Sequence, residues 1–186
     1  MKKLLILLFS LLLLSSHSVF ADDISDFEIE GISIGDSLLD YMTEDEILEE
    51  IELNKDFNLH LKEPNKYAGV FLFNSSTTYD DGISFLIKNN SQNQYISNKN
   101  EKYIIRNVRG MIGYEGDFDS CIEKRNEIVE GLSGMFPNAH TRKETFVLRG
   151  DPSGNSLKSD VHFELKSGSL IEVSCDNYEE TFRIKN

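Results

Sequence analysis

The clearest hydrophobic pattern in the chain lies between Asp117 and Phe136. Apolar residues recur there at intervals of three and four, the spacing that places them on one face of an α-helix. Ser120 and Glu123 have the spacing of a capping box, and Pro137 ends the pattern because proline cannot continue a helix. The pattern therefore predicts one long amphipathic helix in the second half of the chain.

A second helical region is predicted near the N-terminus. An extended segment of isoleucines around Gly31 leads to Gly35, which permits a sharp turn, and Asp36 or Ser37 can cap a short helix after it. Thr43 and Glu46 then form a second capping box, which begins another helix. We expect two short helices that meet at Thr43.

Aromatic and β-branched residues gather in short runs, which predict strands. These runs are residues 67–73, 83–88, 103–114, 145–149, 161–165, 171–175 and 181–184. In the long run at 103–114, a period of two places Ile104 and Val108 on one face, together with Ile112 and Tyr114. Apolar and polar residues alternate on both sides of Ser167-Gly168, which predicts a hairpin.

The order of these elements predicts an α+β fold with a mainly antiparallel sheet. A unit of helix followed by three strands occurs twice, although no repeat is visible at the level of residues. We expect a single domain over residues 22–186. The polar segments at 89–101 and 150–160 are predicted loops, where a binding surface would be sought.

The first 21 residues read as a signal peptide. Lys2 and Lys3 precede an apolar run from Leu4 to Leu14, and Val19-Phe20-Ala21 fits the small-residue cleavage rule. An uncleaved anchor is the alternative, but the run is short for a membrane span and serines separate it from Ala21. The expected mature protein begins at Asp22 in the periplasm or outside the cell, without a membrane span.

The two cysteines, Cys121 and Cys175, remain in the expected mature chain. An even number of cysteines in an oxidising compartment favours a disulfide. Cys121 lies on the apolar side of the predicted long helix, and Cys175 shares a strand face with Ile171 and Val173. The predicted bridge joins the helix to the sheet.

The chain is acidic, with 32 Asp and Glu against 19 Lys and Arg and a formal charge of −13. Loss of Lys2 and Lys3 with the signal peptide lowers this charge to −15. Such a surface repels nucleic acid and anionic lipid, so neither is an expected partner. The simplest explanation of this charge is that it keeps the protein soluble, and the more specific alternative is that the protein binds a basic partner.

Catalytic chemistry has one formal motif. Gly31-Ile32-Ser33-Ile34-Gly35 matches the G-x-S-x-G pattern of serine hydrolases, in which a strained turn exposes the serine. The strand–helix alternation of such enzymes is missing, however, so Gly35 is better explained as a turn and Ser33 as an ordinary strand residue. The sequence therefore predicts no catalytic residue.

Metal and cofactor motifs are also lacking. His60, His140 and His162 are far apart in the sequence, and His162 is expected to be exposed on the polar face of a strand. Asp151, Ser153 and Asn155 imitate the start of a calcium loop, but Ser156 replaces the required glycine and no glutamate closes the loop. We therefore expect a turn at this position, and neither a metal nor a cofactor site.

Three segments resemble a group of uncharacterised exported bacterial proteins. They are the opening Glu30–Leu39, the Gly113-Tyr114 pair before Cys121, and the ending that runs from Lys166 to Cys175. The Ile34–Ser37 turn is also similar to that of small envelope proteins related to the outer-membrane assembly lipoprotein and the β-lactamase-inhibitor-like fold. This likeness implies helices packed on an antiparallel sheet and a role in binding proteins. Membrane tethering does not carry over, because the lipid-acceptor cysteine is missing.

These observations lead to a functional expectation. We expect an exported, non-catalytic binding or interaction protein whose partner is an unknown protein or small ligand. A purely structural envelope protein is a related alternative. The alternative of a different class is a small exported hydrolase that uses dispersed carboxylates or Ser33.

Overall fold

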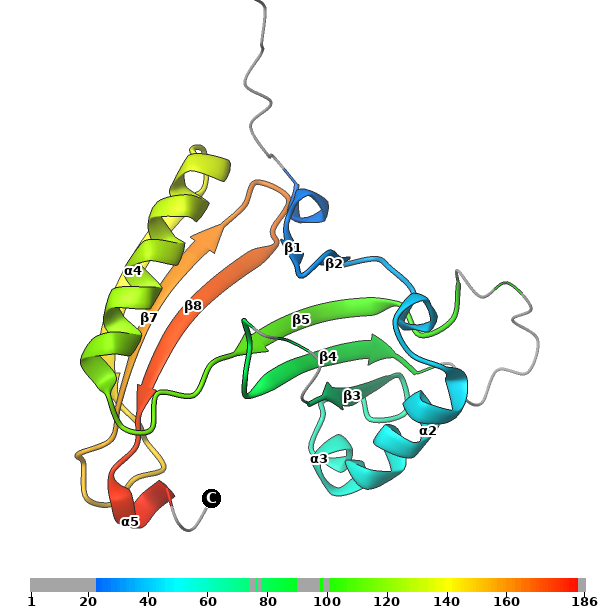
Figure 1. Cartoon of the computed structure of the whole chain (residues 1–186), viewed down its shortest axis with the longest axis horizontal. Helices are drawn as coiled ribbons and strands as arrows, with labels where there is room; N and C mark the ends of the chain where they lie inside the picture. Colours follow the sequence, from blue (N-terminus) through cyan, green and yellow to red (C-terminus); the bar gives the residue numbers. More distant parts are fainter. Residues whose placement is uncertain (1–22, 74–75, 77, 90–97, 99–100, 184–186) are drawn as a thin grey trace, which may run out of the picture.

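The structure is a computed structural model that describes residues 23–73, 76, 78–89, 98 and 101–183 (Figure 1). The predicted signal peptide, most of the predicted loop at 89–101 and Ile184 lie outside these residues. The described residues form an α+β fold with four α-helices and three small antiparallel sheets. Within them, no helix is both long and apolar enough to cross a membrane.

The first half of the fold packs helices on a three-stranded sheet of order β3-β4-β5. Its elements are α2 (Glu44–Leu53), α3 (Lys55–Leu59), β3 (Tyr67–Leu72), β4 (Gly82–Lys88) and β5 (Ile105–Met111). Ile47 of α2, Val70 of β3 and Phe85 of β4 are buried in one hydrophobic core. Buried and partly buried residues alternate along β4 from Ile83 to Lys88, because one face of this strand meets the core and the other does not.

The second half repeats the arrangement with a sheet of order β6-β7-β8. Its elements are α4 (Phe118–Met135), β6 (His140–Val147), β7 (Leu157–Glu164) and β8 (Leu170–Asn177). Leu132 of α4 packs with Val161, Phe163 and Ile171 in a second hydrophobic core. The expected unit of helix and three strands is therefore present twice.

An N-terminal segment connects the two cores. It contains η1 (Ile24–Asp26), the small hairpin of β1 (Glu28–Ile29) and β2 (Ile32–Ser33), and η2 (Leu38–Asp40). Phe27 packs against both cores, whereas Ile29 and Leu38 are buried in the first. Gly31 lies at the hairpin turn with φ of 77° and Gly35 has φ of 100°, which are conformations that glycine adopts at little cost.

One predicted capping box is confirmed and the other is wrong. The Thr43 hydroxyl accepts a hydrogen bond from Glu46 N–H, and the Glu46 carboxylate accepts one from Thr43 N–H at 2.8 Å, as expected at the start of α2. In α4, however, Asp117 is the N-cap and accepts from Ser120 N–H at 3.0 Å. Ser120 therefore lies inside the helix, because the aspartate caps it three residues earlier.

The predicted strand at 103–114 is shorter and has a different face. A register shift leaves Arg106 without a partner in β4, so Ile87 pairs with Ile105 and Phe85 pairs with Val108. Ile105 is fully buried, and Val108, three residues later, also packs against the core. The prediction that Ile104 shares a face with Val108 is wrong, because the bulge breaks the period of two.

The ends of the second sheet also differ from expectation. The strand predicted at 145–149 begins earlier, as β6 pairs with β7 from His140 onward. The predicted last strand is wrong, since Glu180–Arg183 forms the short helix α5. The Glu179 carboxylate accepts hydrogen bonds from the N–H groups of Thr181 and Phe182, which caps the start of this helix.

The predicted disulfide is confirmed. Cys121 of α4 and Cys175 of β8 are bonded, with their Cα atoms 5.9 Å apart. Arg125, one turn further along α4, is buried and donates a hydrogen bond from Nη1 to the Ser159 hydroxyl of β7 at 2.6 Å. Both contacts hold α4 on one face of the sheet and leave the opposite face uncovered by this helix.

Candidate functional site

The two three-stranded sheets have four end strands, and two of these have covered or charged edges. At β3, Asn58 accepts a hydrogen bond from Gly69 N–H at 2.7 Å and Glu50 accepts one from Phe71 N–H at 3.4 Å. At β6, the consecutive charged residues 142–144 occupy an exposed strand. Side-chain hydrogen bonds and charges of this kind discourage pairing with another chain.

The other two end strands, β5 and β8, border a groove of about 530 Å³. The outer edge of β5 is hydrogen-bonded at its start, where Ile105 N–H donates to Asp36 O and Ile105 O accepts from Gly35 N–H. Beyond Ile105, and along β8, the described residues supply no strand on the outer side. Backbone groups of both strands are therefore available along the groove.

The groove walls combine apolar surface from both halves of the molecule. Phe71 and Leu86 contribute from the sheet of β5, while Ile128 of α4 and Val173 of β8 contribute from the opposite side. Phe57 contacts Phe71 edge to face, with ring centroids 5.9 Å apart, and half of its own surface is exposed. Exposed aromatic rings beside a groove supply contact area for a ligand.

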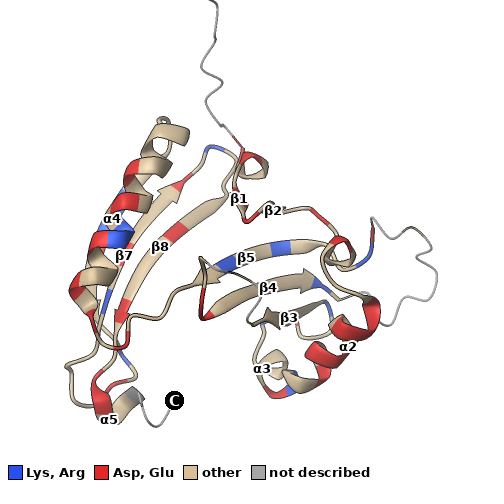
Figure 2. Ribbon diagram, viewed as in Figure 1, with Lys and Arg blue, Asp and Glu red and all other residues tan. Residues whose placement is uncertain are grey.

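The charged side chains of the groove differ from the acidic character of the whole chain. They are Arg109, Lys124, Arg125 and Glu172. Lys124 is paired with Glu127 at 2.8 Å, and Arg125 is buried on Ser159. Arg109 is exposed and has neither a hydrogen-bond nor a salt-bridge partner in the described part of the chain. Figure 2 shows this basic character on β5, in contrast to the acidic surface of α2.

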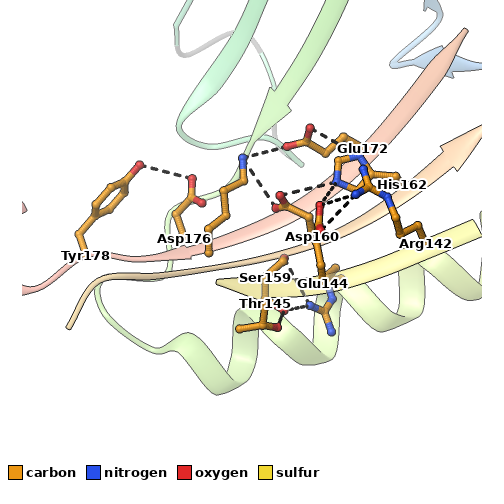
Figure 3. A network of polar contacts seen from close by, with 11 residues as sticks. Arg142, Glu144, Thr145, Ser159, Asp160, His162, Glu172, Asp176 and Tyr178 are labelled. Atoms are coloured by element: carbon orange, nitrogen blue, oxygen red, sulfur yellow. Dashed lines mark hydrogen bonds and ion pairs between the residues drawn. The ribbon is translucent and has the colours of Figure 1, made fainter. Parts of the chain in front are cut away.

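A network of charged residues covers the face of the second sheet that points away from α4 (Figure 3). Asp160 and His162 of β7 are buried at its centre, although both are polar. Glu144 and Arg142 reach them from β6, and Glu172 reaches them from β8. Glu172 also lines the groove, so the network and the groove adjoin.

The His162 ring lies among carboxylates without a hydrogen bond. Its Nε2 is 3.6 Å from Glu144 Oε1 and 3.7 Å from Asp160 Oδ2, and its Nδ1 is 4.0 Å from Glu172 Oε2. Neither ring nitrogen has a hydrogen-bond partner. One ligand atom each from Glu144, Asp160 and His162 lie within 4.8 Å of one another, an arrangement able to hold a metal ion.

Two basic side chains contact the carboxylates of this cluster, and Arg142 contacts both oxygens of Glu144, including Oε1, which faces His162. Arg142 Nη1 lies 3.1 Å from Glu144, and Lys158 Nζ lies 2.9 Å from Glu172 and 3.7 Å from Asp160 Oδ1. Burial raises the pKa of the Asp160 carboxyl above its usual range, although Lys158 opposes this shift. Burial also acts to raise the pKa of Glu172, but the hydrogen bond and the positive charge of Lys158, together with other charges nearby that include Arg109, outweigh it and lower that pKa.

The expectation that His162 is exposed is therefore wrong. It lies on the polar face of β7 as predicted, but only 7% of its surface is accessible. Side chains from the strands on both sides of β7 cover it. A search of the sequence for neighbouring histidines does not find this group of residues. The group contains a single histidine, and Glu144 comes from another strand.

Ser33 lies in β2, and its N–H donates to Asp36 Oδ2 at 3.0 Å. Its hydroxyl has no hydrogen-bonded imidazole or carboxylate in the described part of the chain, so no general base is in place to activate it. The turn role of Gly35 agrees with its positive φ. The G-x-S-x-G pattern thus has a local structural explanation.

The segment that imitates a calcium loop is a tight turn. The Asp151 carboxylate is buried and accepts hydrogen bonds from the N–H groups of Ser153, Asn155 and Ser156. These bonds and one from the Ser153 hydroxyl hold the pKa of Asp151 well below its usual range. Because the carboxylate is already engaged by the backbone, the expected turn is confirmed.

The groove between β5 and β8 and the adjoining charged network are thus the two features with functional geometry. Comparisons of the chain with protein-family models, with curated proteins and with solved structures gave no match.

Proposed function

We propose that this is an exported, non-catalytic binding protein that takes an extended segment of a protein partner into the groove between β5 and β8. The observation that carries this proposal is the contrast among the four end strands. The edges of β3 and β6 are covered or charged, whereas those of β5 and β8 border a groove of about 530 Å³.

An extended polypeptide suits this groove for three reasons. Its backbone can pair with a free strand edge, which is a recurring mode of peptide recognition. Its apolar side chains can contact the aromatic wall that includes Phe57 and Phe71. An acidic side chain can pair with Arg109, which is exposed and makes no hydrogen bond or salt bridge within the described residues, although its charge acts on Glu172 and Tyr178.

Export is supported by two independent features. The first 21 residues have the charged, apolar and small-residue regions of a signal peptide. The Cys121–Cys175 disulfide fits an oxidising compartment such as the periplasm or the cell exterior. The resemblance to exported envelope proteins that bind other proteins agrees with this function.

The hydrolase alternative receives less support from the geometry. Ser33 has no general base hydrogen-bonded to it among the described residues, and Asp36 binds its backbone rather than its hydroxyl. A fluorophosphonate probe tests the point directly. Labelling of Ser33 would restore the hydrolase, and we expect none.

A charge-reversal pair tests the binding function. We expect the immobilised mature protein to capture a specific protein from the exported fraction, and Arg109→Glu to reduce that capture several-fold. Lys62→Glu is the matched control, since Lys62 is exposed and lies outside the groove lining. Equal capture by the two variants would contradict the groove as the binding site.

A further inference from the structure

The spacing of Glu144, Asp160 and His162 is wrong for hydrogen bonds and right for shared coordination of a cation. The His162 Nε2 atom lies 3.6 Å and 3.7 Å from the two carboxylate oxygens, beyond the range of about 2.7–3.2 Å for N–H···O bonds. Two ligands at about 2.1 Å from a tetrahedral zinc ion are about 3.4 Å apart. The two separations from Nε2 are thus close to what such an ion requires, and all three ligand atoms lie within 4.8 Å of one another.

The burial of His162 supplies a second, independent observation. Its side chain is 9% exposed, and both ring nitrogens are buried without a hydrogen bond. A buried polar group without a hydrogen bond destabilises the folded protein. Both ring nitrogens of His162 are such groups, because no atom of the described residues forms a hydrogen bond with them. A cation bound at Nε2 would pair that nitrogen, and Nδ1 would still face Glu172 at 4.0 Å.

Neighbouring groups have the arrangement that commonly supports a metal ligand. Glu172 Oε2 lies 4.0 Å from Nδ1 of His162, on the far side of the ring from the two ligand carboxylates. At this distance Glu172 makes no hydrogen bond to Nδ1, and a hydrogen bond formed there when a metal binds would orient the ligating ring and raise its basicity. Arg142 holds the Glu144 carboxylate in place, and Lys158 lies between Asp160 and Glu172.

We propose that Glu144, Asp160 and His162 form a binding site for a divalent transition cation, with zinc as the best match. Nitrogen and carboxylate oxygen ligands suit zinc, whereas magnesium prefers oxygen alone. Three protein ligands leave a tetrahedral ion one further position, for water or for a group of a bound partner. The site adjoins the groove at Glu172 but does not depend on what the groove binds.

Calorimetric titration of the tag-free mature protein with zinc chloride tests the site. After treatment with a chelator, the protein is expected to bind one equivalent of zinc and to bind magnesium far more weakly. His162→Gln and Glu144→Gln are each expected to weaken zinc binding at least about tenfold. Zinc should also raise the melting temperature of the wild type but not of His162→Gln, because a ligand of the folded state stabilises it.

His140→Gln is the matched control. His140 lies 3.5 Å from Glu164 on the same sheet, but its side chain is 74% exposed. This variant is expected to bind zinc as tightly as the wild type. The proposal would be overturned if His162→Gln bound zinc as tightly as His140→Gln, or if the wild type bound none. Circular dichroism of each variant verifies the fold.

Discussion

Thr43 shows how a single side chain fixes the start of a helix. Its hydroxyl and the Glu46 carboxylate satisfy backbone N–H groups that α2 leaves unpaired. Thr43→Ala is expected to lower the free energy of unfolding by about 1 kcal/mol, as measured by urea denaturation. Thr43→Ser retains the accepting oxygen and should keep most of the stability, so an equal loss in both variants would argue against capping.

Asp151 makes a prediction about acid stability. Its pKa is lower in the folded protein than the ordinary value of about 3.9, because backbone N–H groups and Ser153 bind the ionised form. The stabilisation is therefore present above about pH 4 and is lost as the pH falls toward the folded pKa. Asp151→Asn should be less stable than the wild type at neutral pH, with a difference that shrinks on acidification.

Urea unfolding at several pH values measures this difference. Asp26→Asn is a suitable control, since Asp26 lies in the short helix η1 and no side-chain hydrogen bond or salt bridge to its carboxylate is present among the described residues. A constant difference between the wild type and Asp151→Asn across the acid range would show that the turn is not stabilised by the charge of Asp151.

At the same scale, the sequence indicated little of the charged network. His162 lies in the strand predicted at 161–165, but Asp160 belongs to the predicted loop at 150–160. In the structure β7 begins at Leu157, so the two residues lie on one face of the same strand. This extension of the strand, the burial of both residues and the approach of Glu144 depend on how β6 pairs with β7, which sequence position does not specify.

Among the elements, the Cys121–Cys175 bridge is the main covalent constraint. It joins α4 to β8 across 54 positions of sequence, and chain-entropy estimates give a stabilisation of about 4 kcal/mol for such a loop. Replacing both cysteines with alanine is expected to lower the free energy of unfolding by about this amount. A reducing agent should destabilise the wild type and leave the double variant unchanged. If the reducing agent changed both equally, the bridge would not be the cause.

Periodic elements were predictable from the sequence and locally irregular ones were not. The apolar spacing of α4 and the alternation of β8 arise from burial of one face, which the residue types record. The bulge at Arg106 depends on pairing with β4, and α5 depends on capping by Glu179. Strand pairing and a local helix cap therefore determined the structure of these two segments, which differs from the structure that their residue pattern predicts.

In the whole molecule, Phe27 is the residue that packs against both hydrophobic cores. Phe27→Ala is expected to cost about 2 kcal/mol, less than a fully buried phenylalanine, because the residue is partly exposed. Amide hydrogen exchange should become faster in β4 and in β7. Leu59→Ala is the control, since Leu59 is 71% exposed. Faster exchange in one half alone would contradict the linking role of Phe27.

The groove itself could not be predicted from the sequence. Its existence depends on which strands end each sheet and on how the two halves face each other. The residue pattern indicated the two units but gave no order of strands. The loops at 89–101 and 150–160 were the place to look for a binding surface, whereas the proposed surface lies along two strand edges, where unpaired backbone groups are presented in order.

Site-specific photo-cross-linking in the exporting cell tests the groove most directly. A benzoylphenylalanine residue would replace Asn107 of β5 or Leu170 of β8, which line the groove, and Glu49 of α2 as the exposed control. The account predicts that Asn107 and Leu170 cross-link to the same partner protein, through one extended segment, and that Glu49 does not. Cross-links to that partner from Glu49 alone, or from none of the three positions, would contradict it.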